Sequence, residues 1–294
     1  MPITLRQLDI FHKVAISGHV TKASEQLLLS QSAVSMSLAE LEKYAGAPLF
    51  ERCGRTLCLN DRGRAILPDV KEVLRRVGLI DDYLNESVEE PIGALHVGAS
   101  TTIGNYLLPF IVGEFSRRHG RAKTRLHVNN SKKIELAVEN GDYDLGLIEG
   151  PSHQSSLQVT FWRDDELVIV VNTKHPWAQE RTVLLEQLEK ASWIMREEGS
   201  GTREIFEDAM NLHGFKSSVT MELGHTEAIK KAVESGLGVS CLSRMAVQRE
   251  LEHGWLIEVQ SPLDLRRRLT ILTRKGQYQT KLLRAFLALL EEKK

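Results

Sequence analysis

The sequence predicts an α/β protein with a helical N-terminal domain, a long connecting helix and a larger C-terminal region. Three observations support this prediction. Residues 21–46 read as two short helices joined by a tight turn. A helical pattern then runs from Asp61 to about Asn85. From residue 91 onward, short apolar strands alternate with helices, which predicts parallel sheets covered on both faces.

The chain has 294 residues, enough for two or three modest domains, of which 42% are hydrophobic and 26% charged. Its net charge is −1, so any contact with nucleic acid must come from a local patch. Residues 1–76 hold eleven Lys and Arg against eight Asp and Glu, a basic excess of three. Because the sequence shows neither a signal-peptide pattern nor a spanning apolar run, we expect a cytoplasmic protein with no membrane partner.

The first predicted helix lies between Thr4, a capping residue, and Gly18, which suits the left-handed residue that ends many helices. Its expected core residues recur at helical spacing: Leu5, Leu8, Phe11, Ala15 and Ile16. We expect Thr21 to cap the second helix. The inward-facing residues of that helix are expected to be Ala23, Leu27 and Leu28.

The third helix follows a Ser30 cap and has two contrasting faces. Its apolar stripe consists of Val34, Leu38, Leu41 and Ala45. The opposite face has mostly small side chains and almost no acidic residue. It consists of Gln31, Ser32, Ser35, Met36, Ala39 and Lys43. A surface helix normally carries long charged side chains there, whereas a helix in a DNA major groove needs short hydrogen-bonding groups beside the bases. We therefore favour a DNA-reading helix over an ordinary surface helix.

Residues 51–60 predict a two-stranded wing, with Arg52 and Arg55 at its edge. Arginines there can reach phosphates or a narrow minor groove, although they could also be solvated loop charges. Cys53 and Cys58 could lie close across this hairpin and act as a redox pair. The simpler interpretation is that they and Cys241 are ordinary reduced thiols, because no spacing typical of a metal site is present.

The long helical pattern after Asp61 needs a partner for its apolar stripe. The stripe consists of Ala65, Ile66, Val70, Val73, Leu74, Val77, Ile80 and Leu84. Because a helix of this length cannot bury such a stripe on a small domain, we expect it to pair with a second subunit. Pro68 should kink this helix or end a short first segment. Residues 89–93 read as a break and a hinge.

The C-terminal region has too many strands for one sheet of ordinary size, so two smaller domains with a cleft fit better. The expected strands are residues 95–99, 126–128, 145–148, 167–171, 193–195, 219–223, 239–242, 256–259 and 269–273. Helices are expected between them, including 105–118 and 281–292.

Polar residues cluster where these strands end, and ligands of open sheets bind at such ends beside helix N-termini. The residues are Ser100, Thr101, Thr102, Asn130, Ser131, Ser200, Gly201, Thr202 and Thr226. Their converging donors would suit a small oxyanion or carboxylate, although each could be only a helix cap. Arg196, Arg203 and His225 could add positive charge. Glu149, Glu197 and Glu227 count against a strongly anionic ligand unless some point away.

Catalytic motifs are missing from the sequence: there is no Gly-x-Ser-x-Gly, His-Glu-x-x-His or Walker loop. Residues 199–202 are too short for a phosphate loop and no lysine follows them. We expect no catalytic residue, metal or cofactor. A DNA-binding architectural protein without a ligand is the alternative, and an enzyme on a binding-protein-like fold is less favoured.

Residues 5–52 resemble the winged helix-turn-helix signature of LysR-type transcriptional regulators, and the resemblance extends over essentially the whole chain. Residues 99–109, 148–151, 196–204 and 222–244 are similar to regulators of sulfite or cysteine metabolism and of carbon-fixation genes. The resemblance implies a domain at 1–60 that binds double-stranded DNA, a linker helix at 61–90 that dimerises, and an effector domain at 91–294. It also implies a homotetramer.

The same resemblance implies a periplasmic-binding-protein-like effector domain of two α/β subdomains, residues 91–162 with 267–294, and residues 163–266. DNA contacts carry over to Thr21, Lys22, Gln31, Ser32, Ser35, Met36 and Arg52. Many relatives have Arg where this chain has Met36, so a bidentate guanine reader is lost there. The effector site is expected to comprise the polar strand-end residues with Glu149, Arg196 and His225. Sulfite is the first candidate ligand.

Overall fold

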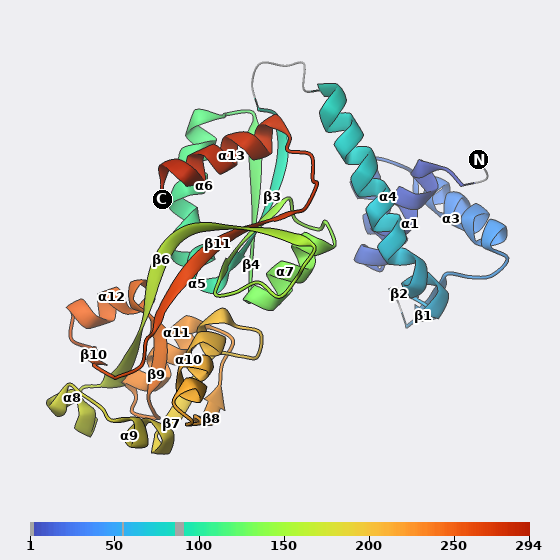
Figure 1. Ribbon diagram of the computed structural model, residues 1–294. Helices are drawn as coiled ribbons and strands as arrows, with labels where there is room; N and C mark the ends of the chain where they lie inside the picture. The colour runs from blue at the N-terminus through green and yellow to red at the C-terminus, as the bar shows by residue number, and fades with distance from the viewer. Residues whose placement is uncertain (1–2, 55, 86–90) are drawn as a thin grey trace. The chain divides into compact units, whose positions relative to one another are not determined.

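The computed structural model describes residues 3–54, 56–85 and 91–294. The chain divides into two units, Met1–Ser87 and Val88–Lys294, and each is described by itself. The first unit contains three helices, a hairpin and a long helix (Figure 1). Their bounds are α1 Leu5–Ser17, α2 Val20–Leu27, α3 Gln31–Ala45, β1 Phe50–Cys53, β2 Thr56–Leu59 and α4 Asp61–Asn85.

The helix caps of the first unit follow from the sequence. Thr4 and Gln7 form a capping box at the start of α1, and Gly18 ends that helix with φ of 67°. Ser30 Oγ accepts the Ala33 N–H, 3.2 Å away, at the start of α3. The core beneath these helices consists of Ile10, Phe11, Val14, Ala23, Val34, Leu38, Leu41, Leu49, Phe50 and Val70. The apolar stripe predicted for α3 is therefore confirmed.

Four details predicted for α1 and α2 were wrong. Leu5 and Ile16 are 49% and 66% exposed, because the buried stripe of α1 is set by Ile10, Phe11 and Val14. Leu28 is 93% exposed, because it takes a left-handed conformation at the end of α2 and points its side chain away from the core. Thr21 does not cap α2, which begins at Val20 after His19.

Helix α4 is continuous from Asp61 to Asn85, and Pro68 does not end it. Val70 enters the core of the first unit, and Ile66, Leu67 and Leu74 pack against that core. Val73 and Ile80 remain 39% and 55% exposed, so part of the apolar stripe has no cover within the unit. The predicted hinge at 89–93 falls partly outside the described residues.

The second unit alternates strands and helices, as the sequence predicted. Its elements are β3 Gly93–Ser100, α5 Thr101–Tyr106, α6 Leu108–Arg118, β4 Ala122–Asn129, α7 Ser131–Glu139, β5 Leu145–Glu149, β6 Leu157–Asn172, α8 Pro176–Glu180, α9 Leu185–Lys190, β7 Ser192–Met195, α10 Gly201–Leu212, β8 Ser218–Glu222, α11 Thr226–Glu234, β9 Ser240–Ser243, α12 Arg244–Glu252, β10 Leu256–Val259, β11 Arg266–Arg274 and α13 Lys281–Glu292.

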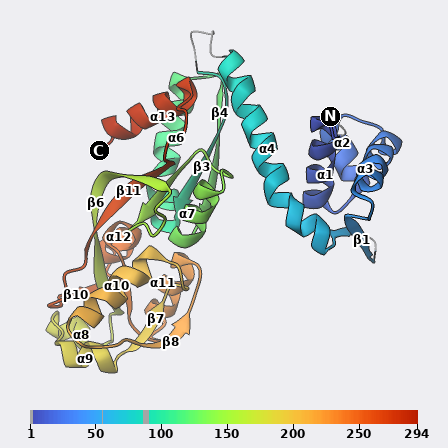
Figure 2. The same cartoon turned by 45° about the vertical axis from the view of Figure 1, so that its right-hand side comes forward.

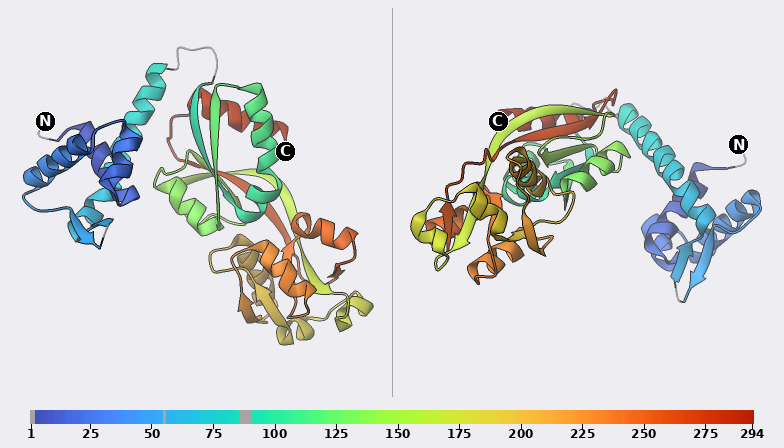
Figure 3. Two further views of the ribbon diagram at one scale, coloured as in Figure 1. Left: turned by 180° about the vertical axis from the view of Figure 1, so that it is seen from behind. Right: turned by 60° about the horizontal axis from the view of Figure 1, so that its bottom comes forward.

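One seven-stranded sheet has the order β10-β6-β11-β5-β3-β4, with β9 also paired to β6, and β7 and β8 form a separate parallel pair. Strands β3, β4 and β5 are parallel. Strand β6 pairs antiparallel with β9, β10 and β11, so the expectation of purely parallel sheets was wrong. Figures 2 and 3 show β6 and β11 running together between the two ends of this unit.

We call β3–β5, α5–α7 and α13 the first lobe, and β7–β10 and α8–α12 the second lobe. Each lobe has its own buried core. In the first lobe α6 and α13 pack through Phe115 and Phe286, whose ring centroids are 5.0 Å apart. In the second lobe the rings of Trp193 and Phe206 lie 4.3 Å apart. Strands β6 and β11 join the two cores.

Two predicted boundaries in this unit were wrong. The helix expected at 105–118 is divided into α5 and α6 at Leu107, and Pro109 occupies the first turn of α6. The strand expected at 167–171 is only the end of β6, which begins at Leu157. Charged residues in the middle of this strand, at 163–166, pair with β11 and interrupt its apolar pattern before the run at 167–171.

Candidate DNA-binding and effector sites

The polar face of α3 is exposed as predicted. Gln31, Ser32, Ser35 and Met36 all lie on the surface, with Met36 66% exposed. Glu40 is also exposed on α3, and its carboxylate accepts a hydrogen bond from Gln7 Nε2 at 3.3 Å. The face thus offers short hydroxyl and amide groups and one thioether, which is the chemistry that base edges require.

The hairpin is fixed to the helices by backbone hydrogen bonds. The Glu42 carboxylate on α3 accepts the N–H groups of Leu49 and Phe50, at 2.8 and 3.3 Å. The Leu57 N–H on β2 donates to the Gly18 carbonyl at 2.8 Å. Because these three bonds connect the hairpin region to α3 and to the end of α1, they hold the wing at a set position beside α3.

Exposed residues of α2 and the wing complete the candidate DNA surface. Thr21 and Lys22 are exposed in the first turn of α2, and Arg52 is exposed on β1 opposite Leu57. Arg55, the other predicted wing arginine, lies outside the described residues.

Cys53 and Cys58 are free thiols on the wing, and Cys241 is a free buried thiol. Cys53 pairs with Thr56 and Cys58 with Glu51, so both cysteines lie on the same face of the hairpin. A hydrogen bond with Cys58 raises the pKa of Cys53. A raised pKa disfavours the reactive thiolate, which supports the interpretation of ordinary reduced thiols.

The second candidate site lies in the second unit, where β3, β5 and β7 end near the starts of α5, α7 and α10. Asn130 is a true cap, since its side chain accepts the Lys133 N–H at 3.0 Å. Ser100 and Ser200 precede α5 and α10 but make no capping bond. The cap interpretation therefore accounts for Asn130 and leaves the two serines unexplained.

Arg267 on β11 is the residue that the sequence analysis missed. Its side chain is fully buried and pairs with Asp165 at 2.6 Å. It also donates to Thr202 Oγ1 at 2.9 Å and to Thr102 Oγ1 at 3.3 Å. Because Thr102 belongs to the first lobe and Thr202 to the second, this guanidinium connects the predicted residues of both lobes.

Arg196, which follows β7, makes a second link between the lobes. It donates to Thr101 Oγ1 at 3.0 Å and forms a two-pronged pair with Glu197. Burial alone would raise the pKa of Glu197, but the Arg196 guanidinium outweighs it and lowers the pKa. Glu197 therefore stays ionised and neutralises Arg196 at neutral pH.

Glu149 lies at the end of β5, with its side chain 2% exposed. Its carboxylate accepts the Thr102 N–H at 2.8 Å and lies 3.8 Å from Arg267. Its backbone carbonyl accepts the Ser131 hydroxyl at 3.3 Å. The cluster therefore holds three carboxylates, those of Glu149, Asp165 and Glu197, and two guanidiniums, those of Arg196 and Arg267. Charge alone does not attract an anion to it.

Gly201 allows the lobes to approach. A Cβ atom at this position would lie 2.1 Å from the Glu149 carbonyl oxygen and 2.9 Å from Ser131 Oγ. Nearby, the Lys132 N–H donates to the Gly199 carbonyl at 3.1 Å, and Asn130 Nδ2 donates to the Glu198 carbonyl at 3.4 Å. Any side chain at Gly201 would push the start of α10 away from β5.

Two hydroxyl groups of the cluster have no hydrogen-bond partner among the described residues: Ser100 Oγ and Ser200 Oγ. Both serines are at least 98% buried, being 0% and 2% exposed. Leaving a buried hydroxyl unsatisfied costs about 1–3 kcal/mol. Such a cost points to a missing partner, which a bound ligand could supply.

The remaining predicted residues lie at the margin of this cluster. Thr226 is buried in the first turn of α11, and His225 before it is exposed and makes no capping bond. Arg203 turns to Glu207 and Glu222, at 2.7 and 2.6 Å, and donates to the Arg196 carbonyl. Among the described residues, no hydrogen bond joins His225 to the cluster, and the charge of Arg203 is paired with Glu207 and Glu222 instead.

Within the described part of the chain, no helix is long and apolar enough to cross a membrane. In the same residues, no group of three or more His, Cys, Asp and Glu side chains could hold a metal ion.

Two family models match this sequence. Residues 5–64 match the bacterial regulatory helix-turn-helix protein model of the lysR family, and residues 89–294 match the LysR substrate binding domain. The uncharacterized HTH-type transcriptional regulator YeiE of Escherichia coli is 42% identical over 288 residues, covering 98% of this chain and 97% of that protein. The RuBisCO operon transcriptional regulator of Allochromatium vinosum is 33% identical, covering 94% of this chain and 92% of that protein.

One solved structure of a regulatory domain also resembles part of this chain. The Synechocystis CcmR regulatory domain in complex with 2-PG aligns with a TM-score of 0.64 and 28% identity. The alignment covers 68% of this chain and 96% of that domain.

Proposed function

The chain belongs to the LysR family of transcriptional regulators, and on that premise we propose that it reads promoter DNA with α3 and senses a small oxyanion between its two lobes. The family match and the curated relatives identify a DNA-binding regulator with an effector-binding domain, not an enzyme. Its effector domain has the periplasmic-binding-protein-like fold of that family.

The proposed DNA surface consists of Thr21, Lys22, Gln31, Ser32, Ser35, Met36, Arg52 and Arg55. Gln31 can form a bidentate pair with adenine, and the exposed Met36 can touch a thymine methyl group. Arg52 is suited to a phosphate. These roles divide the surface into residues that choose a sequence and residues that hold any duplex.

Replacing Arg52 and Gln31 separately by Ala should distinguish these roles. Arg52→Ala is expected to weaken binding to selected and random duplexes equally and to reduce the salt slope by about 0.9 for one lost phosphate contact. Gln31→Ala is expected to lose about 1–3 kcal/mol of discrimination at one base pair. Fluorescence anisotropy on a duplex selected from a random pool and on an unselected duplex measures both.

Gln26→Ala, an equal truncation at an exposed position of α2, serves as the control. An equal loss on both duplexes for Gln31→Ala would contradict its reading role.

We propose that residues 61–90 form a linker through which two subunits pair. The exposed Val73 and Ile80 on α4 support this, since they leave an apolar strip uncovered within one unit. On the strength of the family resemblance we also propose a homotetramer. The same resemblance supports dividing the effector domain at 162/163 and 266/267.

The proposed oxyanion site is carried by one observation, the two buried and unpartnered hydroxyls Ser100 Oγ and Ser200 Oγ. They come from different lobes, so a ligand that accepts from both would bridge the lobes. Because the cluster holds more carboxylates than guanidiniums, neutral O–H and N–H donors must supply the binding energy. This favours a small, compact anion, and sulfite is our first candidate. The related CcmR domain, which binds 2-PG, supports a small metabolite as ligand.

Thermal melting of the full chain tests this proposal. All four tryptophans lie in the second unit, so tryptophan fluorescence follows that unit alone. Sulfite, sulfate, phosphate and sugar phosphates are added separately. One of them should stabilise the fold by about 2.7 kcal/mol at about 100 times its Kd. Thr101→Ala and Thr202→Ala should reduce the shift, since they release Arg196 and Arg267. A flat response to every anion would remove this ligand class.

A further inference from the structure

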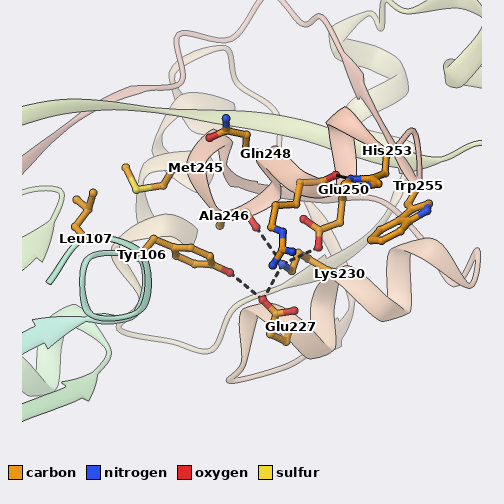
Figure 4. Close-up of a pocket in the computed structure, with 11 residues that line it drawn as sticks. Tyr106, Leu107, Glu227, Lys230, Met245, Ala246, Gln248, Glu250, His253 and Trp255 are labelled. Atoms are coloured by element: carbon orange, nitrogen blue, oxygen red, sulfur yellow. Dashed lines mark hydrogen bonds and ion pairs between the residues drawn. The ribbon is translucent and has the colours of Figure 1, made fainter. Parts of the chain in front are cut away.

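A second pocket lies in the second unit, between the end of α5 and helices α11 and α12 (Figure 4). Its volume is about 770 Å³, within the range of small-molecule sites. Tyr106 and Leu107 enter it from the first lobe, and Lys230 and Glu250 from the second. The residues that line it include no member of the proposed oxyanion site.

The Lys230 ammonium at the inner end of this pocket has no N–H left for a ligand. It donates to Glu227 Oε1 at 2.7 Å, to Glu250 Oε1 at 2.9 Å and to the Ala246 carbonyl at 3.1 Å. Figure 4 shows these groups around the ammonium, with the Tyr106 hydroxyl joined to Glu227. Because an ammonium has three N–H groups, all its donors are committed.

Tyr106 is also committed as a donor. Its hydroxyl lies 2.9 Å from Glu227 Oε1, and it donates to that oxygen. Burial and then this bond raise the pKa of Tyr106 to about 12, so the phenol keeps its proton at neutral pH. The inner end of the pocket therefore presents no free donor from Lys230 or Tyr106.

The Glu250 carboxylate supplies the observation that points to a ligand. The residue is 7% exposed, and its Oε2 atom has no hydrogen-bond partner among the described residues. Figure 4 places this carboxylate inside the pocket beside Lys230. A buried carboxylate oxygen without a donor is costly, and the group that satisfies it must bring an N–H or O–H.

The outer part of the pocket has a different character. Leu107 and Met245 form an apolar wall, and Trp255 stacks on His253 with centroids 4.7 Å apart. Arg249 lines the same pocket and is exposed. A simple amine would satisfy Glu250 but would be repelled by Arg249, whereas an amino acid could offer a carboxylate to Arg249.

We propose that this pocket binds a free amino acid with an apolar side chain. The ammonium group donates to Glu250 Oε2, the carboxylate pairs with Arg249, and the side chain lies against Leu107 and Met245. Because the pocket joins both lobes, such a ligand favours the lobe arrangement in which Tyr106 and Glu227 meet. It is thus a second input, separate from the oxyanion.

Calorimetric titration of the full chain with each standard L-amino acid tests this proposal, with 4-methylvalerate and isoamylamine as the leucine analogues that lack one charged group. An apolar amino acid such as leucine or methionine should bind, and both analogues should bind at least about tenfold more weakly. Glu250→Gln keeps the side-chain shape and should weaken amino-acid binding by about tenfold or more.

Arg249→Gln is a second variant at an exposed position, where folding is not at risk. It should weaken leucine binding and strengthen isoamylamine binding, because the charge that repels the amine is removed. Glu189→Gln makes the same charge change as Glu250→Gln at an exposed site on α9, and it should have no effect on amino-acid binding. The proposal is overturned if no amino acid binds the wild type, if 4-methylvalerate binds as well as leucine, or if Glu250→Gln and Arg249→Gln bind like the wild type. Oxyanion binding, measured on the same samples, reports separately on the other site.

Discussion

Arg267→Met is expected to lower the free energy of unfolding of the second unit by about 3–5 kcal/mol, the cost of breaking a buried ion pair from one side. Arg267 is fully buried and is the cation that faces Asp165 and Glu149, whose side chains are 4% and 2% exposed. Methionine nearly fills the space of the Arg267 side chain. The loss of unfolding free energy therefore measures the unpaired carboxylates and the broken hydrogen bonds to Thr102 and Thr202.

Denaturant unfolding followed by tryptophan fluorescence measures this change. Arg268→Met is the matched control, because the neighbouring Arg268 is exposed and its loss should cost less than about 1 kcal/mol. The double variant Arg267→Met with Asp165→Asn should recover part of the stability, since one stranded charge is then removed. A double variant that is less stable than Arg267→Met alone would refute this explanation.

Phe11→Ala is expected to cost the first unit about 3–5 kcal/mol and to abolish DNA binding. The Phe11 residue is 0% exposed, and its ring packs against the Phe50 ring, with centroids 5.4 Å apart and an interplanar angle of 60°. A small unit buries a small core, so this loss is a large share of its stability. Since α3 rests on the same core, the DNA-reading face loses its support.

DNA binding follows the first unit, whereas tryptophan fluorescence follows the second. Phe11→Ala should remove the first signal and leave the fluorescence transition in place. Ile16→Ala truncates a 66% exposed residue of the same helix and should change stability by less than about 0.5 kcal/mol. Wild-type DNA affinity in Phe11→Ala would contradict the assigned core.

Local patterns were sufficient to predict the helices of the first unit and the last helix. Helix α3 buries its predicted stripe, and the predicted helix at 281–292 coincides with α13. Both bury an apolar stripe and begin at a capping side chain, Ser30 and Thr280. Leu28 was mispredicted because spacing alone does not reveal a left-handed end residue.

The candidate effector cluster was only partly predictable. Strand ends indicated Ser100, Thr102 and Thr202, because polar residues after apolar runs are a local signal. Arg267 carried no such signal, since it lies in the charged run Arg266–Arg268 and its partners are distant in sequence. Only the antiparallel pairing of β6 with β11, which sets Arg267 opposite Asp165, selects it from its neighbours.

The central claim is that an oxyanion bridges the lobes through Ser100 and Ser200, and calorimetric titration of sulfite into the full chain tests it most directly. The wild type should bind sulfite. The Ser100→Ala, Ser200→Ala double variant should bind about 5- to 150-fold more weakly, since each of the two lost hydrogen bonds is worth about 0.5–1.5 kcal/mol. Ser155→Ala, at an exposed position, should bind like the wild type. Equal sulfite affinity in the wild type and the double variant, or no heat with sulfite, sulfate or phosphate, would contradict the claim.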